Sequence, residues 1–321
     1  MSALWRPDRR AVLLAPLAGA ACSTLPQGSP ADEVFRNIET PSESVHSGVA
    51  SDDGERRLTV RLCRYPSLGL AWLWVHARTP RGFFSYVEHQ APCGSDAAPE
   101  AGDRAYYADS ARTLEFERLG PVSGPRAARV QGSVRARRTT TSAFGPGAYP
   151  LSFTIAFLPA RLYSGLNRGR TEIFGRSIAT VTVDGQRFDI EGPAQFHEQR
   201  QTNPRFTVPF AYITLWGKDA AATLLFTQNR REGYLLEGDK ATDVESLRLD
   251  PPGPHRTFTV RLKDGRVLEG AAELVQAYSI PIVGQSWKGH MVRAELAGQR
   301  FSGHMNDFLS DRVPYNGQAA A

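Results

Sequence analysis

The densest group of polar side chains in the sequence lies between Gly192 and Arg200, where the chain runs Gly-Pro-Ala-Gln-Phe-His-Glu-Gln-Arg. Within it, His197 and Glu198 are the residues best suited to proton transfer. A histidine in an apolar cavity can donate or accept a proton near neutral pH, and burial can raise the pKa of a glutamate into the range of a general acid. Successive side chains of a strand point to opposite faces, so only one of the two is expected to point inward unless a bulge intervenes.

The same residues also allow a purely structural interpretation. His197 would then hydrogen-bond across a domain junction, and Glu198 would pair with Arg200 or Arg205. Both interpretations stay open on the sequence alone.

Other catalytic signatures are absent from the sequence. His197-Glu198 begins like a zinc-binding helix motif, but that motif needs a second histidine four residues after the first, and Gln201 stands there. The seven histidines show no other ligand spacing, and there is no Gly-x-Ser-x-Gly elbow, phosphate-binding loop or Cys-x-x-Cys pair. We therefore expect no metal site and no nucleotide cofactor.

Aromatic stripes form a second group of candidate residues. Trp72, Trp74 and His76 alternate along one predicted strand, and Tyr212 and Trp216 lie in a similar run in the second half. Aromatic side chains that face into a barrel can form an apolar pocket, although the ordinary explanation is that they fill the core. The full set of candidate ligand-binding residues is Trp72, Trp74, His76, Tyr86, Arg205, Tyr212 and Trp216.

These residues must be positioned by strands, because the sequence is punctuated by Gly and Pro and rich in short β-type runs. Asp184-Gly185 and Asp264-Gly265 each lie between two such runs and predict hairpins. The tetrapeptide Gly-Gln-Arg-Phe occurs twice, at 185–188 and at 298–301, and indicates two related β units.

Many short strands need closure to avoid exposed edges. The sequence therefore predicts an all-β fold of two tandem lipocalin-like antiparallel barrels packed against each other. We place the first barrel at 36–198, a junction at 199–204, the second barrel at 205–310 and a flexible tail at 311–321.

The first 22 residues predict an export signal. Arg9-Arg10 precedes an uncharged run and resembles a twin-arginine signal, and residues 19–23 resemble a bacterial lipoprotein cleavage site at Cys22. Gly19 departs from that pattern, so simple cleavage after 18–20 remains an alternative to lipidation. Residues 23–35 would form a tether, and the protein would be periplasmic or a membrane-anchored lipoprotein.

Export bears on two further expectations. In an oxidising compartment, Cys63 and Cys93 are expected to form a disulfide, although Cys63 could also be a small buried hydrophobe. The formal charge of +5 includes basic residues scattered between Arg126 and Arg138 without interleaved aromatics. This pattern is typical of an exposed strand face, so we expect no nucleic-acid partner.

The order of these parts resembles the two-domain lipocalin-like superfamily of AttH proteins and carotenoid 1,2-hydratases, whose general plan lipocalin-like Diels–Alderases share. The likeness covers most of the chain after residue 36 and rests on Glu172-Ile173-Phe174-Gly175, the strand run 181–188 and the histidine segment that follows. It implies a hydrophobic pocket at or near the junction of two barrels. The family pattern Gly-x-x-Asp-His-x-Trp-Gly keeps only its histidine here, so His197 alone is carried over.

Two functions follow as hypotheses. The first is an enzyme that acts on an isoprenoid or polyene by acid/base-assisted hydration, isomerisation or cyclisation, with His197 or Glu198 as the acid/base. The second is a protein that binds or carries a lipid or isoprenoid without chemistry.

Overall fold

The computed structural model describes residues 41–92, 104–120, 125–140, 143–145, 147–164, 169–202, 206–282 and 285–315. In this part of the chain the secondary structure is strand throughout, apart from two short 3-10 helices, η2 (Pro66–Leu68) and η3 (Ser310–Arg312). The predicted all-β fold is therefore confirmed. None of the helices in these ranges has the length and apolar character needed to cross a bilayer.

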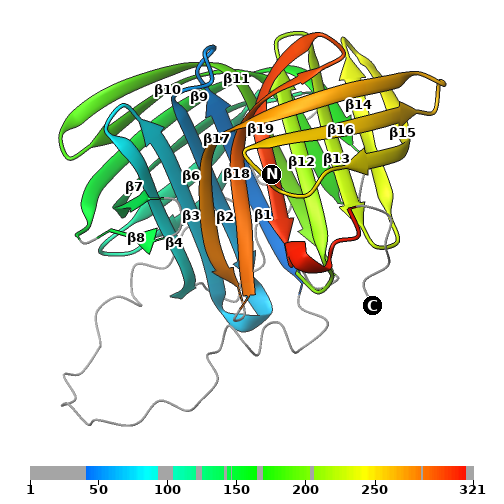
Figure 1. The fold of residues 1–321 in the computed structure, drawn as a ribbon. Coiled ribbons are helices and arrows are strands. Elements are labelled where there is room, and N and C mark those ends of the chain that lie inside the picture. Colours follow the sequence, from blue (N-terminus) through cyan, green and yellow to red (C-terminus); the bar gives the residue numbers. More distant parts are fainter. Residues whose placement is uncertain are drawn as a thin grey trace.

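The first β unit is an antiparallel sheet that curls on itself (Figure 1). Its strands run in the order β4-β3-β2-β1-β11-β10-β9-β7-β6-β5, and β8 pairs with β7. A short pairing of β4 with β7, from Phe83↔Thr139 to Ser85↔Arg137, joins the two ends of the path from β4 to β7. The bounds are β1 (Ser42–Ala50), β2 (Arg57–Tyr65), β3 (Leu70–Thr79), β4 (Gly82–Pro92), β5 (Arg104–Ala108), β6 (Thr113–Leu119), β7 (Ala127–Thr140), β8 (Ala143–Phe144), β9 (Tyr149–Ser164), β10 (Arg170–Val183) and β11 (Gln186–Gln201).

The second β unit is a closed barrel whose strands follow one another in sequence order, with β12 pairing β19 (Figure 1). The last strand of the first unit ends at Gln201, three residues beyond the predicted boundary, and the first strand of the second unit begins at Phe210. The bounds are β12 (Phe210–Gly217), β13 (Ala220–Thr227), β14 (Arg231–Glu237), β15 (Lys240–Leu249), β16 (His255–Leu262), β17 (Val267–Ile282), β18 (Gln285–Leu296) and β19 (Gln299–Phe308).

Both copies of Gly-Gln-Arg-Phe begin at the turn of the last hairpin of their unit. Asp184 and Gly185 have φ of 51° and 79°, and Ala297 and Gly298 have φ of 51° and 78°. Two consecutive positive φ angles are typical of a type I′ turn, whose twist matches that of the strands it connects. At the other predicted hairpin only Gly265 has a positive φ, so β16 and β17 are joined by a wider turn.

Each barrel is filled by its own apolar side chains. Val60, Phe116 and Phe157 belong to the core of the first unit, and Leu224 and Phe258 to that of the second.

Strand alternation places the predicted stripe of β3 on the outside of the first barrel. Leu73 and Val75 belong to the core of that barrel, whereas Trp72 and Trp74 pack with Tyr278 of the second barrel. The expectation that this stripe faces into a barrel was therefore wrong. The stripe lies between the two barrels, because its alternate residues already fill the interior.

Arg57 of β2 holds the two barrels together. Its guanidinium is buried and donates hydrogen bonds to the carbonyl oxygens of Gly303 (2.9 Å) and Val292 (2.7 Å) in the second barrel and of Gly54 (2.9 Å) in the first. Close packing adds to this contact. Trp216 of β12 lies against Gly48 of β1 so closely that a Cβ at that position would come within 2.4 Å of the indole ring.

Candidate functional site

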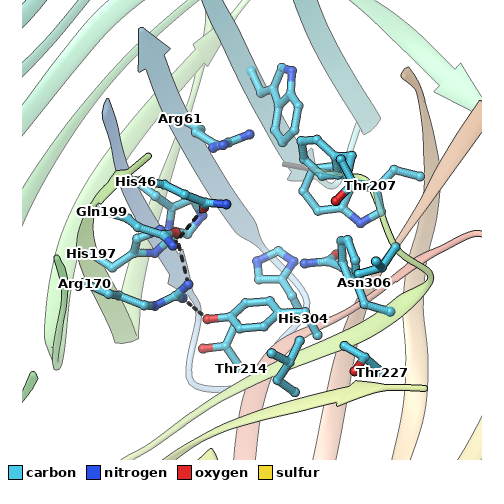
Figure 2. A pocket seen from close by; sticks show the side chains of 18 of the residues that line it. His46, Arg61, Arg170, His197, Gln199, Thr207, Thr214, Thr227, His304 and Asn306 are labelled. Carbon is cyan, nitrogen blue, oxygen red and sulfur yellow. Dashed lines mark hydrogen bonds between the residues drawn. The ribbon is translucent and has the colours of Figure 1, made fainter. Parts of the chain in front are cut away.

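A cavity of about 1270 Å³ lies between the two barrels and opens to solvent at one side. The first unit contributes side chains of β1, β2, β3, β10 and β11 to its wall, and the second contributes β12, β13, β17, β18 and β19. In Figure 2, His46, His197, Gln199 and Arg170 line one side, and Asn306 and Thr207 lie opposite. The site is therefore built by docking one outer barrel face onto another.

On the first barrel, the wall of the cavity is a row of side chains that crosses neighbouring strands. The strand register pairs His46 of β1 with His197 of β11 on one side and with Arg61 of β2 on the other, and Arg61 in turn pairs with Trp74 of β3. Cross-strand partners in an antiparallel sheet point to the same face. Residues separated by up to 151 positions in the chain therefore stand side by side in one row.

The second barrel presents a matching surface. Tyr212 of β12 pairs with Asn306 of β19, and Thr214 pairs with His304, so two neighbouring rows face the cavity. Tyr278 of β17 lies flat across the adjacent strand, because Gly289 of β18 has no side chain to block its ring.

The histidines of the two barrels meet in this cavity. The rings of His46 and His197 are stacked, with centroids 4.8 Å apart, and the ring of His304 approaches His46 edge-on at 6.4 Å. His304 Nε2 also lies 3.1 Å from Thr59 Oγ1 across the barrel junction. His197 lines this cavity, and the structure adds two further histidines, His46 and His304, beside it.

Burial keeps several of these rings neutral. Burial, together with the charges of Arg61 and Arg170, lowers the pKa of His46 to about 3, and burial alone lowers the pKa of His76 to about 3. Burial also lowers the pKa of His304 well below its ordinary value. At neutral pH each of these rings therefore has one N–H donor and one lone pair that can accept a proton or a hydrogen bond.

Several residues that line the cavity have buried polar atoms with no hydrogen-bond partner among the described residues. These atoms include His46 Nδ1, His76 Nε2, His304 Nδ1 and Asn306 Oδ1. Each of these residues is less than 9% exposed. A buried polar group without a partner destabilises a fold by about 1–3 kcal/mol, so the presence of such groups on both barrel faces of the cavity indicates a ligand-binding surface.

A buried carboxylate supports the wall from behind. Glu172 of β10 is 0% exposed and accepts hydrogen bonds from Arg170 Nη2 (2.8 Å), Gln195 Nε2 (2.7 Å), Tyr212 OH (3.0 Å) and Tyr234 OH. The two tyrosines belong to the second barrel, so the network also joins the barrels. Burial raises the pKa of the Tyr212 hydroxyl, which therefore stays protonated and can donate to Glu172.

The remaining part of the wall is apolar and aromatic. The rings of Trp74 and Trp287, one from each barrel, lie 4.6 Å apart, and Phe206 lies 5.7 Å from Trp287. Arg61 stacks over Trp74 at 4.2 Å and so marks the boundary between the aromatic and the polar parts. The cavity therefore has two ends of opposite chemical character.

The structure separates His197 from Glu198, as strand alternation predicts. His197 lines the cavity, whereas Glu198 points to the other face of β11 and pairs with Arg118 of β6 at 2.6 Å. This partner is neither Arg200 nor Arg205, which the structural interpretation favoured. Glu198 is thus placed as an ion-pair residue of the first barrel.

The predicted ligand-binding residues fall into three groups. Trp74, His76 and Tyr212 line the cavity. Trp72 and Trp216 are buried between the barrels without lining it, and Tyr86 points to the first barrel, where its hydroxyl contacts Arg112. Arg205 lies outside the described residues, as do Cys22 and Cys93. Cys63 is buried, and its pairing with Cys93 stays a prediction.

Sequence reasoning missed His46, Arg61, Arg170, Glu172 and Asn306, and it proposed neither His304 nor Asp307 as a site residue. β19 does close the second barrel, and His304 nevertheless lines the cavity. Asp307 points inside the barrel and pairs with Arg256 at 2.9 Å. One signal was available: Arg61 and His304 are polar residues whose neighbours in the strand are apolar or small.

The described residues contain no group of three or more His, Cys, Asp or Glu side chains arranged to hold a metal ion. In the histidine cluster, the rings of His46 and His197 are stacked and the ring of His304 meets His46 edge-on. Hydrogen bonding and proton transfer are the chemistry that these residues offer.

Solved structures of low sequence identity share this architecture. An AttH-like protein from Nitrosomonas europaea is 13% identical with a TM-score of 0.52, over 92% of this chain and 99% of that chain. CghA is 11% identical with a TM-score of 0.50, and CghA with Sch210972 is 10% identical with a TM-score of 0.50; each match covers 84% of this chain and 88% of the other. No family model and no curated protein matches the sequence. The predicted resemblance to the two-domain lipocalin-like superfamily is confirmed at the level of the fold.

Proposed function

We propose that this protein binds a hydrophobic small molecule between its two barrels and converts it by acid/base-assisted hydration, isomerisation or cyclisation. The observation that carries the proposal is the set of buried polar atoms without partners, among them His46 Nδ1 and Asn306 Oδ1, in residues that line one large cavity. Hydrogen bonds from a bound molecule would satisfy them. The structure of CghA with Sch210972, which has the same fold, supports small-molecule binding.

The histidine cluster is the proposed acid/base group. A neutral imidazole such as that of His46 can take a proton from the substrate, and the stacked ring of His197 or the neighbouring His304 can share or return it. The aromatic walls exclude water and orient the apolar body of the substrate. Glu198, which the sequence suggested as an alternative acid, is assigned no role here because it pairs with Arg118 away from the cavity.

A carrier function is the second candidate, and one observation favours it. Burial lowers the pKa of His46 to about 3, so this ring is a weak base at neutral pH. A pocket of neutral donors and acceptors can hold a ligand without converting it. In that case the bound molecule would be recovered unchanged.

We also propose that the protein is exported and is cleaved or lipidated at its amino-terminal end. The proposal rests on the basic start, the uncharged run and Cys22 in the first 22 residues. Cell fractionation of the wild type and of Cys22→Ser tests it. Lipidation predicts that only the wild type is held at the membrane, and cytoplasmic recovery of both proteins would contradict export.

The test of the enzymatic proposal begins with untargeted profiling of small molecules in cells with and without the gene. The molecule that accumulates without the gene is then incubated with purified protein. We expect conversion by the wild type and a loss of about 100-fold or more with His197→Asn, the magnitude typical of removing a general acid or base.

The matched control is His255→Asn. His255 is exposed and does not line the cavity, so this variant should convert the substrate at the wild-type rate. Thermal unfolding of both variants separates a loss of chemistry from a loss of the fold. Full activity in a folded His197→Asn protein would refute the assignment of His197, and unchanged substrate with the wild type would favour the carrier.

A further inference from the structure

The described lining of the cavity contains arginines and histidines but no carboxylate. Arg61 and Arg170 belong to its wall, and Arg200 and Arg230 lie where it opens to solvent. A wall of one charge sign with low-dielectric sides concentrates the electric field and favours ligands of the opposite sign. The arginines in this lining therefore favour a negatively charged ligand.

The nearest buried carboxylate does not belong to the binding surface. Glu172 stands behind Arg170 and already accepts hydrogen bonds from four side chains. It neutralises Arg170 and fixes the orientation of that side chain. Arg61 is the other buried arginine of the wall, and the strand register places it directly beside His46.

The partnerless atoms lie in the same part of the cavity as these charges. His46 neighbours Arg61 on one barrel, and His304 and Asn306 face it from the other. A neutral imidazole can turn an N–H toward a ligand oxygen, and a guanidinium binds a two-oxygen group with two parallel hydrogen bonds. This end of the cavity suits a delocalised oxyanion.

The other end is lined by rings. Trp74, Phe206 and Trp287 form a continuous aromatic surface that begins where Arg61 stacks on Trp74. Such a surface binds an apolar or conjugated body. A ligand that matches both ends must be amphiphilic.

We propose that the ligand is an amphiphilic acid whose oxyanion, a carboxylate or an enolate, is held by Arg61 with His46 and His304, while its apolar body packs on Trp74, Phe206 and Trp287. This inference rests on the proposed function and names the substrate class of that site. It also favours one class of reaction. A positive site stabilises negative charge that develops on oxygen and raises the energy of a carbocation.

The test compares two fluorescent probes that differ by a single charged group. 1-Anilinonaphthalene-8-sulfonate carries a sulfonate oxyanion, and N-phenyl-1-naphthylamine is the same aromatic body without it. Both are titrated into the full-length protein at neutral pH. We expect the sulfonate to bind at least about tenfold more tightly, which corresponds to about 1.4 kcal/mol. Equal or tighter binding of the neutral probe, or no binding of the sulfonate, would overturn the inference.

Variants locate the preference. Arg61→Gln should weaken binding of the sulfonate probe about tenfold, with little effect on binding of the neutral probe, and so remove the preference. Arg61→Lys should retain part of the preference because the positive charge remains. Arg187→Gln is the matched control, since Arg187 is exposed and pairs with Asp189 away from the cavity. An unchanged preference in folded Arg61→Gln would contradict the assigned position of the oxyanion. If Arg61→Gln does not fold, the ratio of the affinities for the two probes is compared between Arg61→Lys and the wild type, and an unchanged ratio would contradict the assignment.

The two proposals fail in different ways. Conversion of an uncharged molecule, together with no preference for the sulfonate probe, would support the proposed function and refute the inference that the ligand is an acid. A clear preference for the sulfonate probe without conversion of any cellular molecule would support an acidic ligand and favour a carrier function over an enzyme.

Discussion

The buried ring of His76, which lines the cavity, makes the stability of the folded protein depend on pH. Its Nδ1 lies 2.9 Å from Ser85 Oγ, and its ring packs between Phe83 and Tyr278. Burial lowers its pKa from 6.5 to about 3, so the folded protein keeps the ring neutral where the unfolded chain would protonate it. The same holds for His46, where Arg61 and Arg170 add to the effect.

These shifts predict that the protein loses stability in mild acid. Between pH 6.5 and about 3 the unfolded state binds more protons than the folded state, so the free energy of unfolding falls as the pH falls. Each ring contributes about 1.4 kcal/mol per pH unit within that window. Urea unfolding at pH 7.5 and at pH 5 should give a lower free energy of unfolding at pH 5. The difference between the two pH values should be smaller in His76→Gln than in the wild type.

The exposed His255 provides the control for this measurement. His255→Gln should leave the pH dependence of the wild type unchanged, because the ring is exposed in the folded protein. The same pH dependence in wild type and His76→Gln would show that the ring of His76 titrates normally in the folded state.

At the scale of the strands, local sequence predicted much of the fold. Alternation correctly placed Trp72, Trp74 and His76 on one face of β3, and the Asp184-Gly185 pair gave the hairpin between β10 and β11. Alternation assigns side chains to two faces but does not say which face is the interior. That ambiguity explains why the stripe was expected inside a barrel.

The strand β1 shows why most of the site escaped sequence analysis. Its inward residues are Val45, Ser47 and Val49, which give only a weak hydrophobic pattern, so His46 stood in no predicted strand. The partners of His46 are set by the pairing of β1 with β2 and with β11, and β11 is distant from β1 in sequence. A single sequence does not show which residues of two distant strands are paired.

The contact between Gly48 and Trp216 gives a prediction at the scale of two packed strands. Gly48→Ala would place a methyl group within 2.4 Å of the buried indole ring, which should destabilise the protein by about 1–3 kcal/mol. Chemical denaturation measures this loss.

A double-mutant cycle identifies the cause. Phenylalanine lacks the indole atom that approaches Gly48, so Gly48→Ala should be less destabilising in the Trp216→Phe background than in the wild type. Additive effects of the two changes would mean that the contact with Trp216 is not the reason for the loss.

At the scale of the whole molecule, the two barrels are tied by charged groups that cross between them. Arg57 donates to two carbonyl groups of the second barrel, Arg293 pairs with Glu55 at 2.9 Å, and Glu172 accepts from Tyr212 and Tyr234. The cavity exists only while these contacts hold the barrels in register.

Arg57→Met should therefore loosen the docking and leave each barrel folded. The change removes three hydrogen bonds from a buried guanidinium and leaves the carbonyl groups of Gly303 and Val292 without this donor. We expect circular dichroism to retain the strand signal while calorimetry shows two unfolding transitions and the sulfonate probe binds more weakly.

Arg56→Met is the matched control, since the Arg56 guanidinium donates to Asp189 O (2.7 Å) within the first barrel. It should unfold like the wild type. A single unshifted transition in Arg57→Met would show that Arg57 is not needed for docking.

The position of the cavity outside both hydrophobic cores has a consequence for how such a protein can change over evolution. Residues such as His46, Arg61 and His304 project from outer faces, while separate sets of apolar side chains fill the interiors. Substitutions that alter ligand selectivity can therefore accumulate on those faces without repacking either core. The residues that face the cavity are therefore a different set from the residues that hold each barrel together.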